Sequence, residues 1–347
     1  MPVKLNSSGG GSVTLTTPST ATDYTATFPA ATGTVAYISN SYTGFVPNGR
    51  LTLVSATPVM TSDQTAKTII YYTPYNGNLI LLYNGSVYTW TQFSEISVTL
   101  DATNAVSGSI YDLFVYSDSG TIRLGYGPAW TSSTGRGTGA GTTQIGQVGG
   151  LWVNSNSITL RYSSVATTSV SANQATYVGS FYATANGQTG MAYSPAAAAG
   201  GNNCILGLYN AYNRVTVRSR SSDSTASWTY ASGAFRAANN SNSNRVSWID
   251  GLQQSNVDCQ YFVSFIQTGG QTGYASVALD ATNSVANGYG GFYAQSNSTY
   301  LHGFVTHNAT TPLLGFHYFQ ALEYATGATV TYYGTTTGMQ IMATLEM

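Results

Sequence analysis

The stretch LILLYNGSVYTW (residues 79–90) decides the fold class of this chain. An apolar run at 79–83 and an aromatic-rich run at 86–90 flank Asn84-Gly85, a pair that supplies the positive φ angles of a tight turn. The stretch therefore predicts a β-hairpin with a two-residue turn and aromatic cross-strand partners. Four other Asn-Gly pairs beside apolar or aromatic runs predict further turns: Asn48-Gly49, Asn76-Gly77, Asn186-Gly187 and Asn287-Gly288.

The composition of all 347 residues favours β-structure as well. Only 7% of the residues are charged, against about 25% in typical soluble domains, and there are 27 tyrosines. Tyrosine, threonine and valine fit a pleated surface, while glycine and asparagine form the turns between short strands. Runs of strong helix formers at helical spacing are missing. We therefore expect an all-β fold.

The charge of the chain argues against several partners. Its net charge is −1, so no basic field would attract nucleic acid, and no apolar run is long enough to insert into a membrane. No apolar signal segment follows Met1, so we expect synthesis in a cytoplasm without export. Cys204 and Cys259 lack zinc-ligand spacing, and we expect two buried thiols and no metal. The glycine-rich passage 135–141 lacks the Lys and Ser or Thr of a phosphate loop, which predicts a mobile surface loop and no cofactor.

Positive charge is unevenly placed along the chain. No Asp or Glu lies between Asp118 and Asp223, but six arginines do: Arg123, Arg136, Arg161, Arg214, Arg218 and Arg220. These arginines could form a local cationic face. The favoured interpretation is that they are dispersed and pack their stems over neighbouring tyrosines.

An internal repeat predicts two related β-domains. The stretch SVTLDATNAV (residues 97–106) returns as SVALDATNSV (residues 276–285), and each copy predicts a strand that ends in a turn bonded by its Asp and Asn side chains. We expect antiparallel β-sandwiches at 41–186 and 187–347, the second of them jelly-roll-like, with the loop 193–203 near their boundary. Residues 1–40 are too few and too polar to fold alone, so this segment must gain its order from an assembly.

The segment SGGGSVTLT (residues 8–16) followed by PAATGTV (residues 29–35) resembles the amino-terminal piece of many structural proteins of tailed bacteriophages. That resemblance implies attachment to the virion through this segment. The attachment residues that it implies are Ser8, Gly9, Gly10, Gly11, Val13 and Leu15.

The body of the chain, above all residues 50–130 and 186–252, is similar to proteins encoded in phages and prophages. Its closing aromatic runs, at 315–324 and 330–334, are similar to the last strands of trimeric jelly-roll heads. These resemblances imply a virion location, other tail or capsid proteins as partners and a homotrimer. They bring no catalytic residues with them.

The resulting hypothesis is a non-enzymatic virion protein, first of all a tail fibre or receptor-binding protein. A capsid decoration protein or head fibre is the first alternative, and a polysaccharide-degrading tail spike is the second. Host surface carbohydrate is a possible partner, because sugar rings pack on aromatic planes while polar side chains bond their hydroxyls. The candidate glycan-binding residues are Trp130, Trp152, Trp228 and Trp248, although a core position is the more common role for each of them.

Catalytic chemistry finds little support in the sequence. The carboxylate pairs Asp112 and Asp118, and Asp250 and Asp258, are the closest candidates for glycoside cleavage. A Gly-x-Ser-x-Gly nucleophile motif is missing. Three histidines, at 302, 307 and 317, lack carboxylate or thiol partners at metal-binding spacing. We therefore expect no catalytic residues and no metal site.

Overall fold

The computed structural model describes residues 46–347 apart from 85, 268–270, 287–289, 295–298, 310 and 328, together with strands at residues 3–6 and 12–15. Packing divides the chain into Met1–Ser41 and Tyr42–Met347. In the first unit, β1 (Val3–Asn6) and β2 (Ser12–Leu15) form an antiparallel pair, with Leu5 opposite Val13. Val13 and Leu15, two of the expected attachment residues, thus lie on β2. The other attachment residues, at 8–11, lie outside the described residues.

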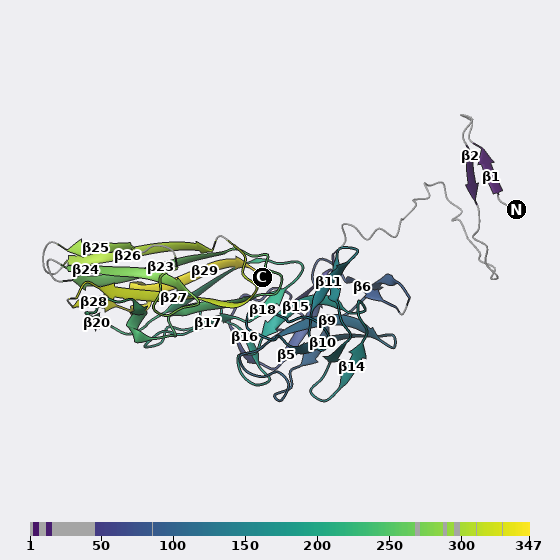
Figure 1. The fold of residues 1–347 in the computed structure, drawn as a ribbon, viewed down its shortest axis with the longest axis horizontal. Helices are drawn as coiled ribbons and strands as arrows, with labels where there is room; N and C mark the ends of the chain where they lie inside the picture. Colours follow the sequence, from purple (N-terminus) through teal and green to yellow (C-terminus); the bar gives the residue numbers. More distant parts are fainter. Residues whose placement is uncertain are drawn as a thin grey trace. The chain divides into compact units, whose positions relative to one another are not determined.

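The second unit contains three large sheets and two small ones, and its described residues confirm the all-β fold (Figure 1). The β9 sheet has the order β11-β12-β15-β9-β10-β13-β14, with β18 paired to β15. Its strands are β9 (Ile110–Asp118), β10 (Thr121–Ala129), β11 (Ile145–Val148), β12 (Leu151–Asn154), β13 (Ile158–Arg161), β14 (Thr167–Val170), β15 (Thr176–Tyr182) and β18 (Leu208–Asn210).

The β27 sheet has the order β25-β24-β27-β22-β17-β16-β4, with β21 paired to β27. Its pairs are antiparallel except that β17 runs parallel to β22. Its strands are β4 (Gln64–Lys67), β16 (Thr189–Met191), β17 (Cys204–Leu206), β21 (Arg236–Ala237), β22 (Arg245–Asp250), β24 (Gln271–Leu279), β25 (Gly290–Ala294) and β27 (Gly315–Ala325).

The β29 sheet has the order β19-β29-β23-β28-β20, with β26 paired to β23. Its strands are β19 (Thr216–Ser222), β20 (Trp228–Tyr230), β23 (Val257–Gln267), β26 (Thr299–Ala309), β28 (Val330–Tyr333) and β29 (Met339–Glu346). The small sheets are β3 (Gly49–Thr52), β5 (Ile69–Pro74) and β8 (Ile96–Thr99), and the hairpin of β6 (Leu79–Tyr83) and β7 (Tyr88–Gln92). The helical turns among the described residues are η1 (Ala238–Asn240) and α1 (Thr335–Gly338), and no helix there could cross a membrane.

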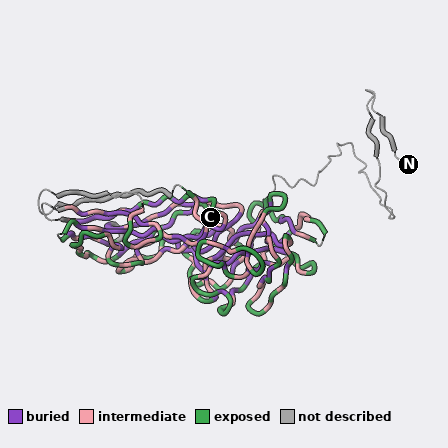
Figure 2. Tube along the Cα trace, in the orientation of Figure 1, coloured by how far each residue is buried: buried purple, intermediate pink, exposed green. Residues whose placement is uncertain are grey.

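Burial follows the strands, and the exposed stretches are mostly loops (Figure 2). Strand β9 is buried on both faces: Leu113 and Val115 belong to the large core, whereas Phe114 and Tyr116 belong to a second cluster. The β27 and β29 sheets contribute to the same large core, which joins Trp248 and Phe319 of the first to Tyr261 and Ile341 of the second. These two sheets form the sandwich of the second half of the chain.

The expected division at residues 186 and 187 stays a prediction. Strand β4 belongs to residues 41–186 and pairs with β16, which belongs to residues 187–347. The large core also contains side chains from both ranges. The loop expected at 193–203 is present between β16 and β17.

The hairpin at 79–90 is confirmed, with Tyr83 opposite Tyr88 and their rings edge to face at 5.6 Å between centroids. The prediction of a two-residue turn is wrong, because four residues connect the two strands. Within this connection the Asn84 side chain accepts hydrogen bonds from the backbone of Ser86 and Val87. Asn186-Gly187 is a turn as expected, with Gly187 at φ +70°. Asn48-Gly49 is not a turn, because Gly49 begins β3 and its missing Cβ leaves room for a tyrosine ring from β5.

The two copies of the repeat differ in the use of their aspartate. Asp101 bonds within its own turn, where its side chain accepts hydrogen bonds from Thr103 and Asn104. Asp280 adopts φ +53° and accepts hydrogen bonds from His317 and from the backbone of Tyr318, 38 residues away. The same sequence therefore closes a local turn in one copy and ties two strands together in the other.

Candidate functional site

Two of the four candidate glycan-binding tryptophans are buried. Trp130 is 6% exposed and Trp248 is 1% exposed, so neither presents a ring face to a sugar. Trp152 is half-buried against the second cluster, and Trp228 is half-buried with its ring parallel to that of Tyr332. A glycan-binding role stays a prediction for Trp152 and Trp228.

The ring of Trp130 covers a buried ion pair. The Arg136 guanidinium lies 4.2 Å from the Trp130 ring centroid and donates to both carboxylate oxygens of Asp112, from Nε at 2.6 Å and from Nη2 at 3.0 Å. It also donates to the Tyr177 hydroxyl and to the carbonyl of Gly251. Burial lowers the pKa of Arg136, but the charge of Asp112 outweighs that effect and leaves the pKa above its usual value. The guanidinium thus joins the β9 sheet to the end of β22.

Residues 135–141 form a loop between β10 and β11, and residues 138–141 are exposed as expected, but the ion pair holds Arg136 in the interior. Gly137, Gly139 and Gly141 all have positive φ, as loop glycines do, but Arg136, which precedes them, is only 8% exposed. The partners of Arg136 are 24 and 115 residues away in sequence. No local spacing in the sequence could have indicated them.

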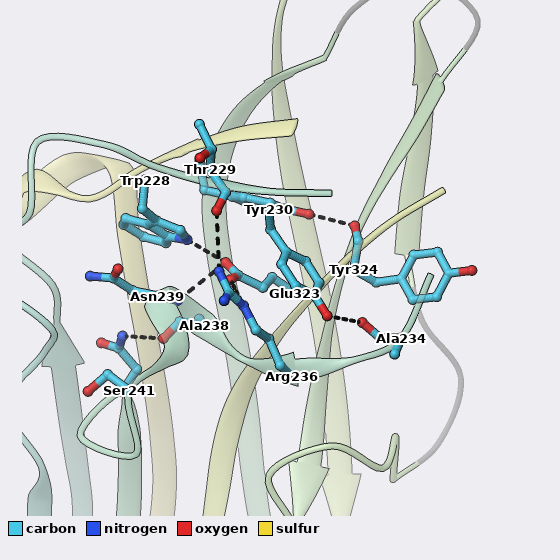
Figure 3. A network of polar contacts seen from close by, with 12 residues as sticks. Trp228, Thr229, Tyr230, Ala234, Arg236, Ala238, Asn239, Ser241, Glu323 and Tyr324 are labelled. Atoms are coloured by element: carbon cyan, nitrogen blue, oxygen red, sulfur yellow. Dashed lines mark hydrogen bonds and ion pairs between the residues drawn. The ribbon is translucent and has the colours of Figure 1, made fainter. Parts of the chain in front are cut away.

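A second polar network surrounds Glu323 of β27, which is 0% exposed (Figure 3). Trp228 Nε1 donates to one of its oxygens and Arg236 Nε donates to the other at 2.7 Å, while the backbone N–H of Asn239 donates at 3.3 Å. The Arg236 guanidinium also lies over the Tyr230 ring, 3.9 Å from its centroid. Burial raises the pKa of Glu323 above its usual value, and these donors only partly oppose it.

Asn239 connects Glu323 to a second buried carboxylate, that of Asp223. Its side-chain amide donates to Asp223 at 2.8 Å, and the amide of Asn244 donates to the same oxygen at 3.0 Å. Burial raises the pKa of Asp223, but its hydrogen bonds outweigh burial and hold the pKa below its usual value. Neither network was expected, because its members come from segments that lie far apart in sequence.

Most carboxylates of the described residues hold the fold in this way. Of the eleven, all but Asp258 accept a hydrogen bond from another residue of the chain. Asp250 is the extreme case, since its two oxygens accept four backbone N–H groups of the turn 252–255. Asp112 and Asp118 are six residues apart on one extended strand, or about 20 Å. This is well beyond the roughly 5–9.5 Å between the carboxylates of glycosidases.

The three histidines do not gather at one place. His302 and His307 both belong to β26 and lie five positions apart along it. His317 belongs to β27 of another sheet. Within the part of the chain that the structure describes, no group of three or more His, Cys, Asp or Glu residues could hold a metal. Cys204 and Cys259 are free and buried, as expected.

His317 links the second repeat to β27. Its Nδ1 bonds Asp280 at 2.6 Å and its Nε2 bonds the carbonyl of Leu314 at 3.0 Å. Burial lowers the pKa of His317, but Asp280, the Leu314 carbonyl and the charge of Asp250 outweigh it, so the pKa lies above its usual value. The protonated imidazole then donates to both neighbours.

The folded protein should therefore gain stability from His317 at acid pH. A group whose pKa is raised by folding stabilises the fold fully below its unfolded pKa of about 6.5 and loses that contribution as the pH rises through the folded value. We expect His317→Gln to lower the melting temperature more at pH 6 than at pH 8.5. Melting curves of both proteins across this range test it, and a gap that widens with rising pH would contradict the assignment.

No protein-family model matches the chain, and no curated protein does. Among solved structures, a chain of infectious bursal disease virus, Gx strain, is 12% identical with a TM-score of 0.18, covering 82% of this chain and 73% of its own. A tryptic core variant of Cry1Da from Bacillus thuringiensis is 10% identical with a TM-score of 0.16, covering 81% of this chain and 48% of its own. Likeness this low carries no argument about the function of this chain.

Proposed function

We propose that this chain is a non-enzymatic structural protein of a tailed-phage virion, a tail fibre or receptor-binding protein. It attaches through its amino-terminal segment and exposes its β-sheets to the host surface. The resemblance at residues 8–16 and 29–35 supports this proposal, as does the division in packing between Met1–Ser41 and Tyr42–Met347. A homotrimer would let weak contacts at single sites act together.

The use of the carboxylates is the observation that carries the non-enzymatic part of the proposal. A polysaccharide-degrading spike needs two carboxylates, roughly 5–9.5 Å apart, that reach the scissile bond as acid and as base or nucleophile. Among the carboxylates of the described residues, only Asp258 accepts no hydrogen bond from the chain. The acid nearest to it in sequence, Asp250, already accepts four backbone hydrogen bonds from the turn 252–255. This arrangement favours a binding surface over a hydrolase.

The attachment role is tested in particles of the phage that encodes the chain. We expect the full chain in purified particles and expect residues 42–347 alone to be absent from them, although both proteins melt at similar temperatures. A chain in which residues 1–41 are scrambled is the matched control and should also be absent. Electron microscopy of labelled particles then locates the chain, and a position on the capsid would replace the tail fibre by a decoration protein.

The non-enzymatic role is tested separately with purified protein and host polysaccharide. We expect the size distribution of the polysaccharide to stay unchanged on gel filtration after long incubation. Shortening of the polysaccharide that Asp258→Asn abolishes would show a spike instead.

A further inference from the structure

The arginines of this chain divide into two groups. Six of the nine lie over an aromatic ring: Arg50, Arg123, Arg136, Arg214, Arg236 and Arg245. Arg161 faces Asp101 at 3.9 Å. Among the described residues, Arg218 and Arg220 alone neither cover a ring nor pair with a carboxylate, and both are exposed. The expected packing over aromatic rings is thus right for three of the six arginines between Asp118 and Asp223, namely Arg123, Arg136 and Arg214. Arg218 and Arg220 need another explanation.

Arg218 and Arg220 line the same groove as Asp258, the carboxylate that accepts no hydrogen bond among the described residues. The groove has a volume of about 390 Å³, within the range of small-molecule sites. No ion pair within 4 Å joins either arginine to Asp258. Charges of both signs are therefore held in one groove without neutralising each other.

Strand register explains how the groove is built. Across β19, β29 and β23, one row consists of Arg218, Thr344 and Asp258, and the next consists of Arg220, Met342 and Gln260. Directly opposite residues point to the same face, so the arginines form one wall, and Asp258 and Gln260 form the other. Thr344 and Met342 of β29 lie between the two walls and form the floor. The two walls stand about 10 Å apart at the backbone, which is two strand spacings.

A loop closes one end of the groove. The backbone N–H of Arg220 donates to the carbonyl of Tyr193, and its guanidinium donates to the hydroxyl of Ser194 at 2.8 Å. Asp63 accepts hydrogen bonds from the backbone of both loop residues, at 2.7 and 2.9 Å. The half-buried Tyr193 therefore has a fixed place beside the arginine wall.

We propose that this groove binds a carboxylate-bearing saccharide. The guanidinium forks of Arg218 and Arg220 receive the carboxylate, because a fork matches its two oxygens. Asp258 and Gln260 on the opposite wall accept hydrogen bonds from the sugar hydroxyls. Met342 and Tyr193 offer apolar surface to the C–H face of the ring. The inference rests on the proposed function for its source, an acidic glycan of the host surface.

Simpler occupants of the groove fit less well. A bare anion would use the arginines but would be repelled by Asp258 and would leave Gln260 without a role. A neutral sugar would leave both guanidinium groups without a counter-charge. A carboxylate side chain from a second copy of this chain would satisfy the arginines, and the test below includes that outcome.

The test measures binding by the full chain with isothermal titration. The probes are a galacturonic acid oligosaccharide, its methyl ester and sialyllactose. We expect binding of at least one acidic probe and none of the methyl ester, which has the same sugar without the charge. Whichever acidic probe binds identifies the class of sugar acid. Equal binding of acid and ester, or no binding of either acid, overturns the proposal.

Variants then locate the site. Arg218→Gln/Arg220→Gln should raise the Kd at least about tenfold, since each lost fork removes charge-assisted hydrogen bonds. Arg123→Gln/Arg161→Gln removes the same charge elsewhere and should leave the Kd unchanged. Asp258→Asn should weaken binding of the saccharide without weakening that of inorganic phosphate. Equal losses from both double variants, or phosphate that binds as tightly as the saccharide, would mean a nonspecific anion site.

Two further readouts separate this inference from its rivals and from the proposed function. Sedimentation of the Arg218→Gln/Arg220→Gln variant should match that of the parent, and loss of an oligomer would assign the groove to a second copy. Particles that carry this variant should contain the chain but adsorb to host cells more slowly. Normal adsorption by such particles would contradict the proposal that the groove binds a host saccharide. If purified particles never contain the parent chain, the proposed virion function is wrong.

Discussion

Replacing Arg136 by methionine is expected to lower the free energy of unfolding by about 3–5 kcal/mol, because removal of one partner leaves a buried charge without compensation. The charge left behind is that of Asp112, which is 0% exposed. The same change removes the donor to Gly251, the contact that joins the β9 sheet to the end of β22. Urea denaturation of the parent and the variant measures the difference.

Two controls separate the buried charge from other effects of this change. Arg123→Met breaks the ion pair with Asp118, whose side chains are 33% and 23% exposed, and should cost no more than about 1 kcal/mol. Asp112→Leu/Arg136→Met removes both charges and should recover much of the stability lost by Arg136→Met, since no charge remains buried. If Arg136→Met costs no more than Arg123→Met, the buried pair does not hold the two sheets together.

The sequence predicted the β class and the positions of several strands, because these depend on local pattern. The apolar run at 79–83 is followed directly by the turn residues Asn84 and Gly85, and it forms β6 as expected. The length of the turn after it was predicted wrongly, because the Asn84 side chain accepts two backbone hydrogen bonds within a four-residue connection. Turn geometry of this kind depends on which of several short hydrogen bonds forms, and the residue types alone allow more than one.

The polar networks could not be predicted, because sheet register decides their partners. Arg236 forms its ion pair with Glu323, 87 residues away in sequence. Arg218 shares its row in the groove with Thr344 and Asp258, which lie on two strands more than 35 residues away in sequence. The repeat at 97–106 and 276–285 shows the limit most clearly. Its two aspartates stand in nearly the same local sequence, but one bonds within its turn and the other bonds His317 on β27.

The tryptophans illustrate the same difficulty for binding residues. Residue type allowed each of the four to be either a sugar-binding surface or a core side chain. Burial excludes sugar binding for two of them, Trp130 and Trp248. Trp248 faces inward because β22 pairs with β27 and sets it opposite His317, with the Phe319 ring 5.0 Å from its own. The groove that carries the saccharide proposal contains no tryptophan at all among its lining residues.

Trp248→Ala is accordingly expected to act on stability. It removes a side chain that is 1% exposed from the large core and leaves a cavity between Phe319 and His317, at a cost of about 3–5 kcal/mol. Trp152→Ala is the matched control and should cost less, because part of that ring already contacts water and leaves a smaller cavity. Urea denaturation measures both. A Trp248→Ala protein that is as stable as its parent but binds saccharide more weakly would show that Trp248 contacts the sugar. The binding surface would then lie on the β27 sheet and not in the groove of β19, β29 and β23.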